Sequence, residues 1–119
     1  MATILIVDDE VLIREALRRF LEIQGHTVLE AGDGVDALAV LNEQEVDLAV
    51  VDLVMPRMDG MGLLSRMRAD YPSTKVIIVS GYDEVFDMAQ REIDVVAIVS
   101  KPFQLSEVAD AVRAALGES

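Results

Sequence analysis

Five short apolar runs, separated by segments with helical spacing, constrain the fold of this chain more than any other feature. The runs are TILIV (3–7), HTVLE (26–30), DLAVV (47–51), KVIIV (75–79) and VVAIV (95–99). Most of them are nearly continuous in Val, Ile, Leu and Ala, which is typical of parallel strands that are covered on both faces. The sequence therefore predicts one parallel sheet.

The segments between the runs carry apolar residues at helical spacing. The first stripe consists of Ile13, Ala16, Leu17, Phe20 and Leu21, and the last of Leu105, Val108, Ala109, Val112 and Leu116. Gly25 suits a left-handed helix end and Asp33 suits a helix N-cap, and a fourth helix is expected over 83–93. Right-handed crossovers place such helices on both faces of the sheet. We expect an α/β doubly wound fold of five strand–helix repeats, as a single domain over residues 1–119.

The composition fits a packed globular protein and excludes several kinds of site. Hydrophobic residues make up 52% of the 119 residues, and there is no cysteine for disulfides, thiolate metal sites or thiol nucleophiles. The net charge of −12 argues against direct nucleic-acid binding, and a phosphate ligand would need local positive charge or a metal ion. No apolar stretch reaches membrane-spanning length and no basic leader precedes the first run, so a cytoplasmic protein without membrane contact is expected.

Polar side chains follow four of the five runs. In chain order they are Asp8, Asp9, Glu10, Asp52, Ser80 and Lys101. Ligand sites in open parallel sheets form at the carboxyl ends of the strands, so these side chains are expected to converge. Taken singly, Asp8 or Asp9 could simply cap the first helix, Ser80 could be a turn residue and Lys101 a solvated surface charge. Their shared placement favours a common site.

Asp52 interrupts the stretch LAVVDLVMPRMDG (48–60), although a buried, unpaired carboxylate is costly. Carboxylates that lie together repel one another unless a cation intervenes. Mg²⁺ prefers oxygen ligands and commonly takes one or two carboxylates with water and phosphate. A carboxylate beside such a metal can attack phosphorus to give an aspartyl phosphate, and a lysine and a hydroxyl would hold the new phosphoryl oxygens.

Four motifs carry a resemblance to a known family. They are ILIVDDE (4–10), VVDLVMPRMDG (50–60), VIIVSG (76–81) and SKPF (100–103). In order and spacing the chain resembles the receiver domain of two-component response regulators, over essentially its whole length. The resemblance implies the flavodoxin-like (βα)5 fold, with a five-stranded parallel sheet in the order 2-1-3-4-5.

The resemblance also implies a role for each matched residue. Asp52 would be the phosphoacceptor, Asp9 would bind Mg²⁺ directly, and Asp8 would bind it mostly through water. The backbone carbonyl of Val54 would be a further metal ligand, and Mn²⁺ would be an alternative ion.

The remaining matched residues would bind the phosphoryl group or shape the backbone. Lys101 would bind a phosphoryl oxygen, and Ser80 would reach toward the phosphate on activation. A cis peptide is expected at Lys101–Pro102. Gly60 would permit a sharp backbone turn into the third helix.

The implied function is a phosphorelay signalling switch. A sensor histidine kinase or phosphotransfer protein would donate the phosphoryl group, and the fourth helix, fifth strand and last helix would pass the state to an effector domain or protein. A homodimer linked to phosphorylation is a further expectation. The chain would catalyse only its own phosphorylation and dephosphorylation. Because no effector follows residue 119, it is either free-standing or a fragment.

Several positions depart from the family pattern. Ile98 stands where the family usually has an aromatic residue, and Asp94-Val95 replaces the usual Gly-Ala pair. Ser80 is still expected to move, with the output surface responding through backbone and helix shifts. Val54 and Tyr82 flank the expected site and predict slow loss of the phosphoryl group, because they would restrict the hydrolytic water.

Three other functions compete with the signalling switch. A phosphorylation-independent interaction module is favoured by Ile98 and opposed by the complete set of acids and lysine. An aspartate-nucleophile phosphatase usually has a second acid two residues after its nucleophile, where this chain has Val54. A flavin-binding electron carrier would offer hydroxyls and amides after the first strand, where this chain has Asp8-Asp9-Glu10.

Overall fold

Five parallel strands form one sheet in the order β2-β1-β3-β4-β5 in the computed structural model, which describes residues 1–81, 83 and 95–117. The strands are β1 (Thr3–Val7), β2 (Thr27–Ala31), β3 (Leu48–Asp52), β4 (Lys75–Gly81) and β5 (Ala97–Lys101). The described helices are α1 (Val11–Ile23), α2 (Gly34–Glu43), α3 (Gly60–Asp70) and α5 (Leu105–Ala115). The predicted doubly wound fold and strand order are confirmed, whereas the helix expected over 83–93 falls almost entirely outside the described residues.

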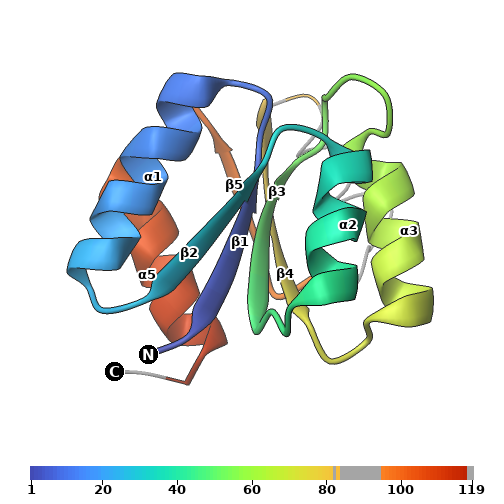
Figure 1. Ribbon diagram of the computed structural model, residues 1–119. Helices are drawn as coiled ribbons and strands as arrows, with labels where there is room; N and C mark the ends of the chain where they lie inside the picture. The colour runs from blue at the N-terminus through green and yellow to red at the C-terminus, as the bar shows by residue number, and fades with distance from the viewer. Residues whose placement is uncertain (82, 84–94, 118–119) are drawn as a thin grey trace.

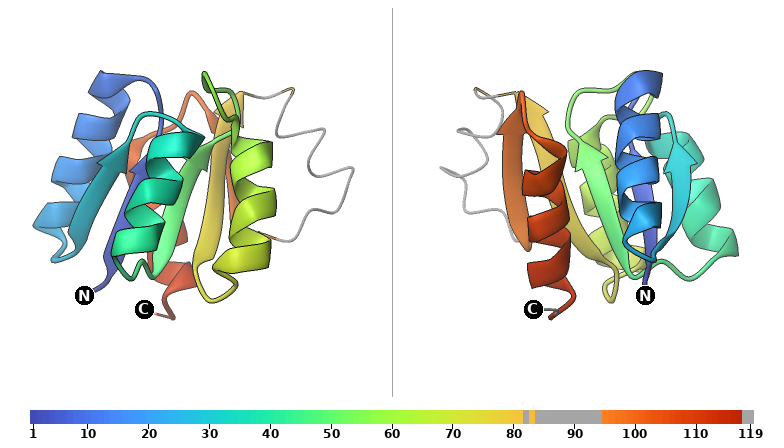
Figure 2. Two further views of the ribbon diagram at one scale, coloured as in Figure 1. Left: turned by 45° about the vertical axis from the view of Figure 1, so that its right-hand side comes forward. Right: turned by 90° about the vertical axis from the view of Figure 1, so that its left-hand side faces the viewer.

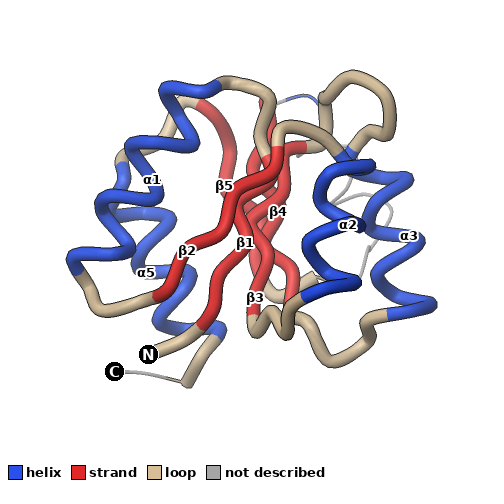
Figure 3. Tube along the Cα trace, in the orientation of Figure 1, coloured by secondary structure: helices blue, strands red, loops and turns tan. Residues whose placement is uncertain are grey.

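Helices cover both faces of the sheet, which explains why the strands are continuously apolar. Helices α1 and α5 lie on one face and α2 and α3 on the other (Figure 1), and Figure 3 shows the strands between the two layers. Successive residues of β1 alternate between these layers: Ile4 and Ile6 pack with the α1 and α5 side, and Leu5 and Val7 with the α2 and α3 side.

The strands after β1 end one or two residues later than the apolar runs predict. Asp52 pairs with Val79, and Ser80 pairs with Ser100, so the polar residues expected just beyond the strands belong to the last strand pairs. Backbone pairing with a neighbouring strand continues past the apolar run and sets where a strand ends. The arrowheads of the strands point to a common edge (Figure 2), where these side chains are held.

Two predicted helix-end residues are confirmed. Gly25 follows α1 with a φ of 98°, a left-handed conformation that glycine adopts without steric cost. Asp33 is the N-cap of α2, and its carboxylate accepts a hydrogen bond from the Asp36 amide at 2.9 Å. Within the described ranges, none of the helices has the length and apolar character needed to cross a membrane.

The role expected of Gly60 needs correction. Gly60 begins α3 without a positive φ, so the helix entry requires no unusual backbone conformation there. Glycine is needed for close approach, because a Cβ atom at this position would lie 2.4 Å from the backbone oxygen of Asp52. Instead, Arg57 has the positive φ in the β3–α3 loop, at 62°.

Arg57 ties the β3–α3 loop to the start of α2. Its Nε donates to Asp33 Oδ2 at 2.6 Å and its Nη2 donates to Asp36 Oδ1 at 2.9 Å. The hydrogen bond from Arg57, and to a smaller extent that from the Asp36 amide, hold the pKa of Asp33 below its ordinary value of 3.8. A lowered pKa means that the ionised Asp33 stabilises the fold above pH 3.8, and that this stabilisation is lost as pH falls through the lowered pKa.

We expect Arg57→Ala to lower the urea midpoint of unfolding more than Arg57→Gly. Both variants lose the ion pairs, but only alanine keeps a Cβ atom in the left-handed conformation. Acidification below the titration of Asp33 should shrink the difference between Arg57→Ala and the native chain. An alanine variant as stable as the glycine variant at neutral pH would contradict the backbone part of this prediction.

Candidate functional site

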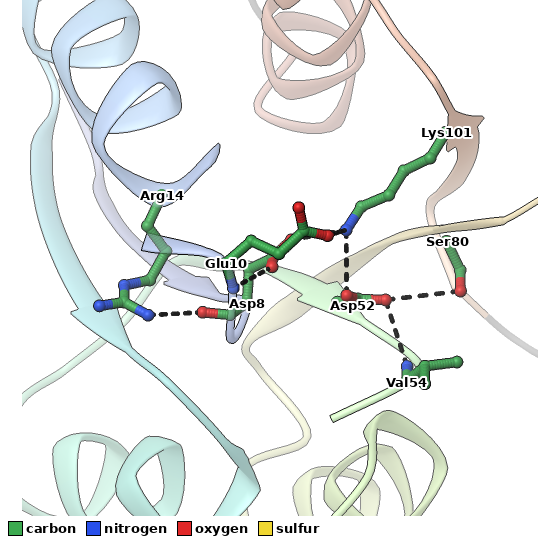
Figure 4. Close-up of polar contacts among 7 residues, drawn as sticks. All are labelled: Asp8, Glu10, Arg14, Asp52, Val54, Ser80 and Lys101. Atoms are coloured by element: carbon green, nitrogen blue, oxygen red, sulfur yellow. Dashed lines mark hydrogen bonds and ion pairs between the residues drawn. The ribbon is translucent and has the colours of Figure 1, made fainter. Parts of the chain in front are cut away.

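Asp8, Asp52 and Lys101 meet at the carboxyl ends of the strands. The Lys101 ammonium lies 3.0 Å from Asp8 Oδ2 and 3.0 Å from Asp52 Oδ2, and it bridges the two carboxylates (Figure 4). Both acidic side chains are almost fully buried, with 4% and 6% of their surface exposed. The peptide before Pro102 is cis, as predicted. The three residues come from β3, β5 and the turn after β1, so only the parallel sheet brings them together.

The second carboxylate oxygen of Asp52 faces the β3–α3 loop and β4. It accepts a hydrogen bond from the Val54 amide at 3.2 Å and a longer one from Ser80 Oγ at 3.5 Å. Ser80 is buried, whereas Val54 is 60% exposed. Tyr82, the other residue expected to limit water access, lies outside the described residues. Every oxygen of Asp52 therefore has a polar neighbour, which explains how a carboxylate is tolerated at the end of a buried strand.

Glu10 joins the site, as its place in the acidic run after β1 predicts, although the family resemblance assigned it no role. Its Oε1 lies 3.3 Å from Lys101 Nζ, and its amide donates to Asp8 Oδ1 at 2.8 Å. Asp9, expected to bind the metal directly, is exposed and lies outside this contact network, and its role stays a prediction. The acidic run Asp8-Asp9-Glu10 predicts carboxylates at this edge of the sheet. Which of them faces Lys101 depends on the backbone path from β1 into α1.

Burial and charge pairing shift two pKa values at the site. Burial raises the pKa of Asp8, and this outweighs the lowering effect of the hydrogen bonds from Glu10 and Lys101. Burial lowers the pKa of Lys101, but its hydrogen bonds to Asp8 and Asp52 outweigh that effect and leave the pKa above its ordinary value. Lys101 therefore remains a cation at neutral pH.

The donor set fits a divalent cation. Asp8, Glu10 and Asp52 each offer a carboxylate oxygen, and these oxygens lie within 4.8 Å of one another. Hard cations such as Mg²⁺ prefer oxygen ligands of this kind. The ammonium of Lys101 among the same carboxylates shows that this position stabilises positive charge.

A family comparison agrees with this geometry. The model of the response regulator receiver domain matches residues 4–113, so the chain belongs to the response regulator receiver family. The fold, the acidic site and the family match together make this a receiver domain of two-component signal transduction.

Curated relatives differ in how much of their length the chain spans. It is 36% identical over 112 residues to sporulation initiation phosphotransferase F of Bacillus subtilis, covering 92% of the chain and 90% of that protein. It is 43% identical over 117 residues to the sensor kinase CckA of Brucella abortus, covering 94% of the chain but 12% of the kinase. The chain spans 49% of the response regulator MprA of Mycobacterium ulcerans, with 35% identity and 95% of the chain covered. Related segments therefore occur both nearly alone and within longer proteins.

Solved structures show the same fold. The response regulator TrrA of Thermotoga maritima, in complex with Mg²⁺-BeF, has a TM-score of 0.84 and 29% identity, with 97% of this chain and 99% of that chain covered. A signal receiver domain of an HD domain-containing protein from Pseudomonas fluorescens has a TM-score of 0.88 and 34% identity, with 98% and 94% covered.

Ile98 stands on β5 where the family usually has an aromatic residue. Ile98 lies on β5 paired with Ile78, and it packs partly buried against the core on the α2 and α3 side. A branched aliphatic side chain packed in this way has no aromatic ring to rotate toward Asp52. The aromatic side chain that is usual in the family is therefore absent at this position, as the sequence indicates.

Proposed function

We propose that residues 1–119 form one cytoplasmic receiver domain that accepts a phosphoryl group onto Asp52. A sensor histidine kinase or a phosphotransfer protein would supply the group from a phosphohistidine. The observation that carries the proposal is the buried Asp52 carboxylate at the end of β3, which shares Lys101 with Asp8. A carboxylate placed beside a fixed cation is suited to attack phosphorus and to keep the product bound.

The transfer moves one phosphoryl group between two nucleophiles. An Asp52 carboxylate oxygen forms a bond to phosphorus, the bond from phosphorus to the histidine nitrogen breaks, and the leaving imidazole nitrogen takes up a proton from water. Lys101 then binds a phosphoryl oxygen, and Ser80 Oγ, already directed at Asp52, donates to another. Beyond this phosphorylation and its own dephosphorylation, no enzymatic activity is proposed.

Asp8, Asp9, Asp52 and the Val54 carbonyl are the proposed Mg²⁺ ligands, with Glu10 near enough to contribute. When bound, Mg²⁺ supplies charge neutralisation for the carboxylates and the phosphoryl oxygens. Mn²⁺ is proposed as a substitute because it also suits oxygen ligands.

The output is proposed to pass through the surface formed by the segment 83–93, β5 and α5 to an effector domain or protein, with a phosphorylation-linked homodimer as one form. Because Ile98 carries no aromatic switch, the response is assigned to movement of Ser80 with backbone shifts in β5 and α5. The exposed Val54 beside Asp52 supports slow hydrolysis of the product.

Intact mass spectrometry tests this function. Incubation with Mg²⁺ and acetyl phosphate should add the mass of one phosphoryl group, the adduct should be lost in hydroxylamine, as expected of an acyl phosphate, and EDTA should prevent its formation. Amide chemical shifts in β5 and α5 should change in the same sample. A chain that gains no mass would favour the alternative, an interaction module that works without phosphorylation.

A further inference from the structure

Arg14 connects the acidic turn to the edge of the sheet. It lies in the first turns of α1, and its Nη1 donates to the backbone oxygen of Asp8 at 2.7 Å (Figure 4). Its Nε donates to Glu30 Oε1 on β2 at 3.1 Å. The side chain is 18% exposed, so most of the guanidinium is enclosed between α1 and β2.

The Asp8 residue is held at all of its polar groups. Its amide donates to the Ala31 oxygen at 3.1 Å, its backbone oxygen accepts from Arg14, and its Oδ1 accepts from the Glu10 amide. Only Oδ2 is left to face Lys101, at 3.0 Å. Arg14 thus holds the peptide between Asp8 and Asp9, which links the Asp8 carboxylate to the Glu10 amide that donates to it.

Arg14 is well suited to this task because of its rigid, forked donor group. Glu30 orients the guanidinium, and Arg18 Nη1 contacts the other oxygen of the same carboxylate at 2.5 Å. A lysine has no planar fork, so it cannot reproduce both contacts with the same geometry. Gly32 leaves room for the guanidinium, since a Cβ atom there would lie 3.4 Å from Arg14 Nη1.

We propose that Arg14 is a positioning residue that sets the cation affinity of the site by holding the Asp8 peptide. This inference rests on the proposed Mg²⁺-dependent function. A positioning role and a purely electrostatic role of Arg14 predict opposite changes in Mg²⁺ affinity when the side chain is removed. Charge repulsion alone predicts that removing Arg14 would tighten Mg²⁺ binding, whereas loss of positioning predicts that it would weaken binding.

Arg18 provides a matched control for this difference. It pairs with the same Glu30 carboxylate from the next turn of α1, but its contacts are with Glu30 and Glu22 and not with the acidic turn. Arg14→Gln and Arg18→Gln therefore remove the same charge from the same cluster, and only the first removes the hydrogen bond to Asp8.

Mg²⁺ titration of each variant, followed by calorimetry, gives the test. We expect Arg14→Gln to raise the Mg²⁺ dissociation constant about tenfold, because loss of the contacts that orient metal ligands generally weakens metal binding by at least this factor. Arg18→Gln should leave the dissociation constant within about twofold of the native value. Arg14→Lys should fall between the native chain and Arg14→Gln, and it serves as the test if the glutamine variant does not fold. Unchanged or tighter binding by a folded Arg14 variant would overturn the proposal.

Hydrogen exchange of the Glu10 amide gives a readout that needs no metal. This amide donates to Asp8 Oδ1, so it should exchange faster in Arg14→Gln and at the native rate in Arg18→Gln. If the native chain bound no Mg²⁺, the proposed function would fail, while this exchange experiment would still decide the role of Arg14. Equal protection in all three proteins would overturn that role.

Discussion

Replacing Asp52 with asparagine is expected to reduce phosphoryl incorporation from acetyl phosphate to the background level. Asparagine keeps the size of the side chain and can still accept the hydrogen bond from the Val54 amide, but its amide is no nucleophile toward phosphorus. The loss should be complete because the other carboxylates of the site, Asp8 and Glu10, follow β1 and occupy different positions beside Lys101.

Intact mass after incubation with Mg²⁺ and donor measures this loss, and circular dichroism shows whether the variant is folded. Asp70→Asn is the matched control, since Asp70 is an exposed carboxylate at the end of α3 whose ion-pair partner is Arg66. That control should accept one phosphoryl group like the native chain. Stoichiometric, Mg²⁺-dependent labelling of a folded Asp52→Asn protein would place the acceptor elsewhere.

Gly60→Ala is expected to destabilise the fold by about 3 kcal/mol or more, at the upper end of the cost of overpacking. The new Cβ atom would lie 2.4 Å from the Asp52 backbone oxygen and 2.6 Å from the Leu53 Cα. Both are main-chain atoms at the end of β3, so relief requires moving the strand end or the whole start of α3. Because that strand end carries Asp52, the proposed phosphoacceptor, the phosphorylation rate should also fall, by about a hundredfold for a displacement near 1 Å.

Gly62→Ala separates this steric effect from ordinary helix propensity. At Gly62 a Cβ atom would meet side-chain atoms only, Met58 Cγ at 3.3 Å and Asp59 Oδ1 at 3.4 Å. Alanine is more favourable than glycine in a helix by up to about 1 kcal/mol, and this gain offsets the cost of the two tight side-chain contacts. The free energy of unfolding of this variant should therefore be near the native value. Urea unfolding and phosphorylation rates of the two variants give the comparison. Equal effects at the two positions would refute the close-approach explanation.

The pattern of apolar runs was sufficient to predict the sheet and its two helical layers. Ile4 and Leu5 are both fully buried because opposite helical layers cover successive residues of β1. A continuous apolar run is what a strand covered on both faces requires, so the run predicts this environment. The strand ends were less predictable, since Asp52 is polar but still pairs with Val79 in the sheet. Local polarity indicates where apolar packing ends, whereas backbone pairing continues as long as a neighbour is aligned.

By itself, the sequence determined most of the side chains that gather at the site. Asp8, Asp52, Ser80 and Lys101 each lie at or next to the end of a strand, and parallel strands bring such residues to one edge whatever the details of packing. The tertiary structure decided how they are held: Glu10 rather than Asp9 faces Lys101, Arg14 fixes the Asp8 peptide, and Gly60 packs against Asp52. These contacts depend on the path of each turn and on the approach of separate segments to within a few ångströms. Residue periodicity specifies the face on which a side chain lies, but it contains no information on those distances.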